Sequence, residues 1–319
     1  MNLTGDAFAA RSRVYTALAT TLDAGLPLAS ALEGAAVRGA AWKDVGPDLA
    51  RRIAGGQSLA QAVGARNDVF SSVEIRLIDA GERSGRLPEA FSRLAHRYER
   101  LAANRRALIW GLAYPALLLH AAVVLPSLPL VVHHGLAGFI GDGVPKLLSL
   151  YAAVFGLWFL VTFLARRPAG LSLPLVGEWL RQRAVADYAF VLGALISAGG
   201  SLPSALRFAA ESLDHPTLRA AGLRVARRVE RGSGLGAAFA SVGQVFDVLF
   251  IEQVKVGEVA GRLEPGLAKA EEIAHDELER QTKRGLVTLT VACFLFAALL
   301  IAWQVIGFWT GYAETLNVG

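Results

Sequence analysis

The chain has 319 residues, of which 54% are hydrophobic and 18% are charged, and its formal net charge is +5. With a mean hydropathy of +0.42, it is too apolar for an ordinary soluble domain. The single cysteine, Cys293, excludes an intramolecular disulfide and a cysteine-based metal cluster.

Residues 1–106 form a polar region that is expected to be helical. Apolar residues recur three and four positions apart, as in Val14–Leu18–Leu22, and no run alternates as a strand would. Glycine pauses divide the region into about six helices, with Ser58 predicted as the N-cap of a short one. The first 15 residues lack the apolar run of a signal peptide, so we expect none to be cleaved. The pauses are at 24–25, 55–56 and 85.

Three apolar blocks follow the pattern of membrane-spanning helices. A bilayer core of roughly 30 Å needs about 20 helical residues, and each block carries no charged side chain over such a length. We predict spans at 107–132, 147–165 and 285–311. A buried core helix is the alternative for each block, and a re-entrant hairpin is a further alternative for the shorter middle one.

The basic residues predict the sidedness of the membrane. All but one of the 32 lysines and arginines lie in 1–106 or 166–284, and the exception is Lys146. Because basic residues stay on the cytoplasmic side, both polar regions are expected in the cytoplasm. The loop 133–146 and the tail 312–319 are expected outside. The net charge therefore reflects topology, and no nucleic-acid partner is inferred from it.

The two polar regions resemble each other. VFSSVEIRLIDAGERSGRL at 69–87 aligns without a gap with VFDVLFIEQVKVGEVAGRL at 245–263 and shares 8 of its 19 positions. Other segments align at offsets of 174 to 176, which indicates a duplication. Pauses in 166–284 fall at 199–200, 232–236 and 261. We therefore predict an all-α membrane protein with two homologous six-helix-bundle cytoplasmic domains, 1–106 and 166–284, and three transmembrane helices.

The last helix of each polar region should run into its span without a break. Leu87–Arg106 contains no glycine, and its one proline, Pro88, lies in the first turn, where proline is tolerated. Leu267–Arg284 contains neither residue. Such a continuous helix can transmit a tilt or rotation that a flexible linker would not.

The repeated sequence G-E-x-x-G-R-L predicts a tight corner between two helices. One glycine suits a left-handed helix end and the other allows close approach of a second backbone. The glutamate is expected to bind free N–H groups at the start of the following helix. The corner either only holds the domain together or also contacts a partner through its glutamate and arginine. Its members are Gly81, Glu82, Gly85, Arg86, Leu87, Gly257, Glu258, Gly261, Arg262 and Leu263.

Two such modules, three spans, AGLPL at 24–28 and the duplicated G-E-x-x-G-x-L together resemble the inner-membrane platform family of type II secretion systems and type IV pili. The resemblance covers nearly the whole chain and implies a multi-pass protein of the bacterial inner membrane with a cytoplasmic N-terminus. It further implies binding to a hexameric cytoplasmic ATPase, to pilins or pseudopilins and to other inner-membrane assembly proteins, in a homo-oligomer of two or more chains. Longer family members carry an additional segment before the first module, and contacts made through it are in question here.

The sequence contains no phosphate-binding loop, H-E-x-x-H or G-x-S-x-G motif, so we expect no enzymatic activity and no cofactor. A small transporter or channel subunit, or a membrane scaffold unrelated to pili, is the alternative function. Transport would favour ionisable residues within the spans, and His120 alone is present. It is expected to pair with a neighbouring helix.

Three further features have open interpretations. Pro115 predicts a kink in the first span, and Pro126 and Pro129 an early end to its helix. His133 and His134 are expected in an exposed turn, with a metal site as the less favoured interpretation. An acidic cluster either holds a divalent cation or forms a solvated face balanced by Arg280 and Lys283. The cluster consists of Glu271, Glu272, Asp276, Glu277 and Glu279.

Overall fold

The computed structural model describes residues 5–36, 42–125, 129–165, 171, 176–243 and 245–317, and these residues contain helices and no strand. Contacts group them into two units. One unit holds 1–106 with 177–279, and the other holds 107–176 with 280–319. The all-α class with three long apolar helices is confirmed.

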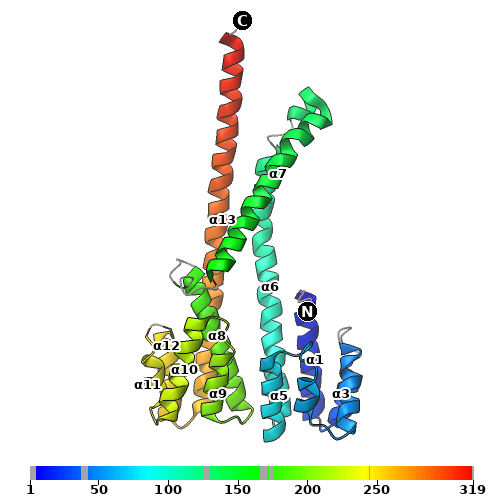
Figure 1. The fold of residues 1–319 in the computed structure, drawn as a ribbon, viewed down its shortest axis with the longest axis vertical. Coiled ribbons are helices and arrows are strands. Elements are labelled where there is room, and N and C mark those ends of the chain that lie inside the picture. The colour runs from blue at the N-terminus through cyan, green and yellow to red at the C-terminus, as the bar shows by residue number, and fades with distance from the viewer. Residues whose placement is uncertain are drawn as a thin grey trace. The chain divides into compact units, whose positions relative to one another are not determined.

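Each repeat supplies five helices and the first part of a long sixth one (Figure 1). That each set packs as one six-helix bundle stays a prediction. The first repeat contains α1 (Gly5–Asp23), α2 (Leu28–Ala36), α3 (Val45–Ala54), α4 (Leu59–Gly64), α5 (Ser72–Ser84) and α6 (Leu87–Val124). The second contains α8 (Val176–Ser197), α9 (Leu202–Glu211), α10 (Pro216–Glu230), α11 (Leu235–Ala240), α12 (Val248–Val259) and α13 (Leu263–Asn317).

The glycines expected to separate helices have left-handed backbones. This conformation costs a side-chain-bearing residue free energy because Cβ crowds the following carbonyl. The helix ends are therefore set locally, as the sequence predicted. The positive φ angles are 78° at Gly25, 87° at Gly56, 73° at Gly85, 83° at Gly199, 88° at Gly232 and 64° at Gly261.

Ser58 caps α4 as predicted. Its Oγ accepts from the backbone N–H of Gln61 at 3.1 Å, and the Gln61 side chain accepts from the Ser58 N–H at 3.2 Å. This reciprocal arrangement satisfies two N–H groups that a helix start leaves unpaired. Ser71 and Glu74 form the same capping box at the start of α5.

Within the described ranges, three helices are long and apolar enough to cross a membrane: Leu87–Val124, Gly143–Leu164 and Leu263–Gly307. The middle one belongs to α7 (Pro129–Ala165), which is interrupted at Gly135 by a non-helical backbone. Residues 133–146, expected as a loop, are therefore helical on both sides of Gly135. Glycine permits this break, and the apolar residues after it continue the helix.

The first span continues through Pro115 and ends at Val124, before the prolines expected to stop it. The kink at Pro115 stays a prediction, and Pro126 lies outside the described residues. His120 contacts a neighbouring helix as expected, because its Nε2 lies 2.6 Å from the Tyr151 hydroxyl on α7. The side chains of His133 and His134 lie outside the described ones.

The core of the first repeat contains a buried ion pair. Arg11 on α1 donates to the Glu74 carboxylate on α5 at 2.6 Å, and the Tyr15 hydroxyl donates to the same oxygen. The other Glu74 oxygen accepts from Ser71. Tyr98 on α6 lies 3.1 Å from Arg11. Full hydrogen bonding offsets the cost of taking these two charges out of water.

The second repeat places apolar residues at the same positions. Val185 and Phe250 correspond to Arg11 and Glu74, at the offsets of 174 and 176 that align the repeats. Phe250 is 1% exposed and packs edge-on to Phe239, with ring centroids 5.2 Å apart. Tyr188 and Phe246 complete this aromatic cluster. One backbone frame is thus filled by an ion pair in one copy and by aromatic rings in the other.

This contrast predicts how the ion pair contributes to stability. Glu74→Ala should destabilise the full-length protein by about 3–5 kcal/mol, because it leaves the Arg11 charge buried without its partner. The double variant R11M/E74L should cost less than Glu74→Ala alone, since apolar residues fill this position in the second repeat. Thermal unfolding in detergent, followed by protease resistance of 5–106, measures both. A double variant less stable than E74A would contradict the interpretation.

Candidate functional site

Both G-E-x-x-G-R-L corners end one helix and begin the next with the same hydrogen bonds. In the first corner (Gly81–Leu87), the Arg86 N–H donates to the Gly81 carbonyl at 2.7 Å and the Gly85 N–H to the Glu82 carbonyl at 3.3 Å. The second corner (Gly257–Leu263) repeats both bonds at 2.9 and 3.1 Å. This is the Schellman arrangement that a left-handed glycine allows. Leu87 and Leu263 are the first residues of α6 and α13.

The other glycine of each corner lies against the long helix, as predicted. A Cβ at Gly81 would lie 2.8 Å from the Ala90 Cβ, and one at Gly257 would lie 2.9 Å from the Gly266 Cα. Both distances are shorter than van der Waals contact. Glycine therefore lets α5 pack closely on α6, and α12 on α13.

The glutamates bind a different helix from the one expected. Glu82 accepts from the N–H groups of Leu59 and Ala60, at 2.6 and 2.8 Å, at the start of α4. Glu258 accepts in the same way from Leu235 and Gly236, at 2.6 and 3.0 Å, at the start of α11. The prediction that they cap the following helix is wrong. Each glutamate does cap the start of a helix, because a carboxylate favours free N–H groups and the positive end of the helix dipole. The capped helix, however, begins over 20 residues before the glutamate and not after it.

The two corner arginines have different surroundings. Arg86 donates to the Ser197 carbonyl at 3.0 Å and lies 3.7 Å from the Glu264 carboxylate. It therefore joins the first repeat to the second. The Arg262 side chain is exposed and makes no ion pair with the part of the chain that the structure describes.

A stripe of arginines along α6 carries the rest of this contact. Arg93, Arg97 and Arg100 follow Arg86 at spacings of seven, four and three, which places them on one helix face. Arg97 pairs with Asp187 on α8 at 3.1 Å, and its guanidinium lies 4.5 Å from the centroid of the Phe190 ring. Arg93 donates to the Ser197 hydroxyl at 2.9 Å. Sequence inspection missed this stripe, although its 3–4 periodicity was visible.

Glu271 on α13 is the common partner of two stripe members. It lies 2.9 Å from Arg93 and 3.2 Å from Arg100, and it is 2% exposed. Burial raises the pKa of its carboxyl, and the two arginines oppose that shift. The solvated acidic face predicted for this cluster is wrong for Glu271. Among the described residues, no group of three or more His, Cys, Asp or Glu side chains is placed to hold a metal ion.

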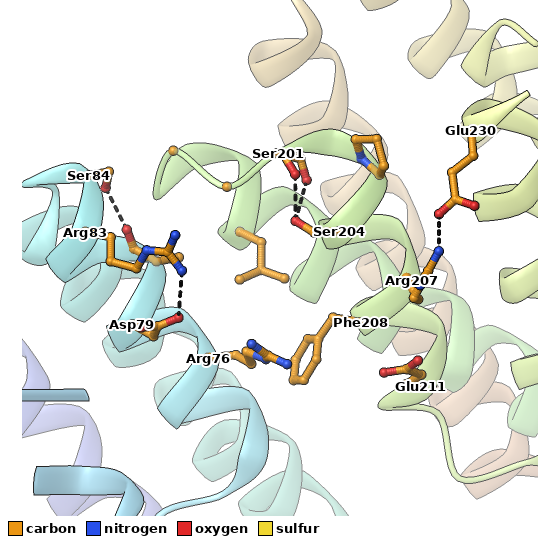
Figure 2. A pocket seen from close by; sticks show the side chains of 15 residues that line it. Arg76, Asp79, Arg83, Ser84, Ser201, Ser204, Arg207, Phe208, Glu211 and Glu230 are labelled. Carbon is orange, nitrogen blue, oxygen red and sulfur yellow. Dashed lines mark hydrogen bonds and ion pairs between the residues drawn. The ribbon is translucent and has the colours of Figure 1, made fainter. Parts of the chain in front are cut away.

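A groove of about 790 Å³ borders the same contact between α5 and the α8–α9 turn. Figure 2 shows Asp79, Arg83 and Ser84 on the α5 side and Ser201 and Ser204 on the other. The Ser84 hydroxyl donates to the Ala198 carbonyl, and the Arg76 guanidinium lies 5.2 Å from the Phe208 ring. Arginines and acidic residues both line the groove, so charged side chains of both signs face it.

The fold and this site define a class of protein, a helical membrane protein with a duplicated module whose copies contact each other through charged side chains. The family described as type II secretion system (T2SS), protein F, matches residues 14–132 and again residues 188–310. The chain belongs to this family.

Curated relatives carry names from two kinds of machine. Type II secretion system protein F of Pseudomonas aeruginosa is 27% identical over 89% of this chain and 78% of its own length. Type IV pilus assembly protein PilC of Myxococcus xanthus is 23% identical over 82% and 69%. PilC of Thermus thermophilus is 27% identical over 86% and 74%.

The glutamate caps predict local stability in both repeats. Glu82→Ala should leave the Leu59 and Ala60 N–H groups without an acceptor, at a cost of about 1–3 kcal/mol. Glu258→Ala should do the same at Leu235 and Gly236. Hydrogen–deuterium exchange of 59–64 and 235–240 measures the change in each. Glu89→Ala, at an exposed position of α6, is the control, and protection unchanged in E82A would contradict the role assigned to the carboxylate.

The contact between the repeats should weaken in acid through His275. Burial, together with Arg100 and Arg97, lowers the pKa of this imidazole from 6.5 to about 4. Unfolded chains therefore bind a proton between these pH values that the folded protein does not, so stability falls as pH falls from 6.5 towards 4, by at most about 3 kcal/mol. Glu271 faces His275 and titrates in the opposite sense, so the difference between the wild type and His275→Gln isolates the effect. Unfolding temperatures whose difference does not change with pH would contradict it.

Proposed function

We propose that this chain is the inner-membrane platform of a type II secretion or type IV pilus machine. It would couple a cytoplasmic hexameric ATPase to the extraction of pilins or pseudopilins from the membrane and to their polymerisation. The observation that carries the proposal is the family match to both repeats, together with three apolar helices. The names of the relatives supply the two kinds of machine.

The continuity of two helices supports the coupling. α6 and α13 each begin at a G-E-x-x-G-R-L corner and continue without a break into apolar sequence. Near these corners, Arg93 and Arg100 bind Glu271, so a displacement of one repeat acts on the other. In the proposed topology, both repeats and the N-terminus are cytoplasmic, because nearly all basic residues lie in them.

An arginine cluster on α10 and its C-cap residue is the surface we assign to the ATPase. Arg224, Arg227, Arg228 and Arg231 line a cavity of about 330 Å³ and are exposed. None of them makes an ion pair with the described residues. Exposed charges of one sign speed association with a surface of opposite sign and select for it. An acidic surface of the ATPase would therefore bind here.

The first repeat provides a matched control. Arg51 and Arg52 of the first repeat correspond to Arg227 and Arg228 of the second. Both pair with Asp48. The residue that corresponds to Asp48 in the second repeat is Arg224, so the acidic partner is replaced by another arginine. The same pair of arginines is thus neutralised in one repeat and unneutralised in the other. Partly exposed ion pairs between residues three or four apart on a helix contribute little stability, so reversing either pair of arginines should leave the fold intact.

We expect R227E/R228E to reduce capture of the ATPase by the full-length protein at least tenfold, corresponding to about 1.4 kcal/mol. Filament or pseudopilus assembly should fall with it, whereas R51E/R52E should change capture far less. Equal effects of the two variants would refute the assigned surface. Failure of the wild-type protein to capture the ATPase would refute the coupling itself.

The transporter alternative predicts a different result. Apart from His120, which lies 2.6 Å from Tyr151, the apolar segments contain no ionisable group of the kind that usually marks a transport path. Substrate flux in vesicles containing only this protein would favour that alternative over a platform.

A further inference from the structure

The duplication creates two equivalent turns as well as two equivalent corners. The first turn (Asp23–Pro27) follows α1, and the second turn (Ser197–Ser201) follows α8. In the first turn, the Gly25 N–H donates to the Leu22 carbonyl at 2.9 Å and the Leu26 N–H to the Thr21 carbonyl at 3.2 Å. The second turn repeats both bonds, 174 residues later, at 2.9 and 2.7 Å.

One corner and one turn are already in contact within the chain. The first corner packs on the second turn, where Ser84 donates to the Ala198 carbonyl and Arg86 to the Ser197 carbonyl. A Cβ added at Gly199 would lie 2.7 Å from the Ser84 Cβ. Ala198 is 1% exposed as a result. This intramolecular contact is therefore a template for how the other corner could bind the other turn.

The other corner and the other turn are exposed in the part of the chain that the structure describes. A Cβ added at Gly25 would meet no atom within 4 Å, whereas one at its counterpart Gly199 would meet the Ser84 side chain. Leu26 is 52% exposed, Val256 is 60% exposed and Val259 is 90% exposed. A large apolar side chain with 90% of its surface in water gains free energy from any partner that covers it.

One pair, the first corner with the second turn, is in contact, and the other, the second corner with the first turn, is exposed. The residues that differ between these two pairs make the exposed pair more apolar. In the occupied contact, Ala80, Arg83 and Gly200 line the groove at its edge. At the equivalent positions of the exposed pair stand Val256, Val259 and Leu26. Where the occupied contact has a polar groove, the exposed surfaces would bring two valines against a leucine.

Charge at the exposed surfaces is complementary as well. Arg262 corresponds to Arg86, and Asp23 corresponds to Ser197, the residue whose carbonyl Arg86 binds. An arginine in the same pose could bind both the Asp23 carbonyl and its carboxylate, and a charge-assisted bond is stronger than a neutral one. Neither the Asp23 nor the Arg262 side chain pairs with another described residue.

We propose that the second corner of one chain binds the first turn of another copy of this chain. The contact reproduces, between molecules, the one that the first corner and second turn make within a molecule. Because each chain then offers two different surfaces, the association is head-to-tail and builds a closed ring or an open row. The proposal concerns the chain's contact with itself and holds whether or not an ATPase binds.

Cysteine cross-linking in membranes tests this contact on the full-length protein. In a C293A background, Ala24→Cys and Ala260→Cys are placed on two differently tagged chains that are expressed together. We expect oxidation to join the two tags in one covalent dimer. A24C expressed with Ser84→Cys is the control and should give at least tenfold less dimer, because the first corner is occupied by its own chain.

Two charge variants identify the contact surfaces. Leu26→Asp or Val259→Asp should reduce the A24C–A260C dimer at least tenfold, whereas Val248→Asp, also exposed on α12, should leave it unchanged. The double variant A24C/A260C on one chain completes the test. A cross-link that forms only within that chain, or no cross-link between the tagged chains, would overturn the proposal.

Discussion

A carboxylate bound to the free amide groups of a short helix is the interaction on which both repeats depend. Glu82 holds α4, and Glu258 holds α11, each through two backbone N–H groups. The same residue precedes the left-handed glycine that starts the long helix. One short sequence therefore fixes two things: where the short helix lies, and where the helix that continues into apolar sequence begins. The glycines of the corner only shape the local turn, whereas the glutamate also holds a helix that lies more than 20 residues earlier in the chain.

The repeats share this frame and use charge differently elsewhere. In the first, Arg11 and Glu74 neutralise each other inside the core, and Asp48 neutralises the two arginines of α3. In the second, the core is aromatic and the arginines of α10 have no described acidic partner. Arginines of α6 then bind a buried glutamate of α13. The duplication thus produced two copies with the same backbone frame, in which ion pairs occupy different positions: one lies inside the core of the first copy, and others join the two copies.

Local features were predictable from the sequence, and contacts across it were not. The turn glycines and the Ser58 cap depend on residues within one helical turn, so their sequence patterns sufficed. Glu82 was recognised as a cap but given the wrong helix, because the choice between α4 and α6 depends on tertiary packing. Glu271 was placed on a solvated face, since composition cannot show that two arginines from another helix bury it. Gly135 likewise interrupts a helix where a loop was expected.

The opposite chemistry of the two cores has a consequence for biosynthesis. Repeats joined in one chain risk exchanging equivalent helices while they fold, since each backbone fits the other's place. Here an exchange of α5 with α12 would put the Glu74 carboxylate among Phe239 and Phe246, and Phe250 beside the Arg11 guanidinium. Both products would bury a charge without a partner, which is strongly unfavourable. The ion pair in one copy and the aromatic cluster in the other are therefore incompatible with each other's helices. Each of these helices packs stably only in its own half of the chain.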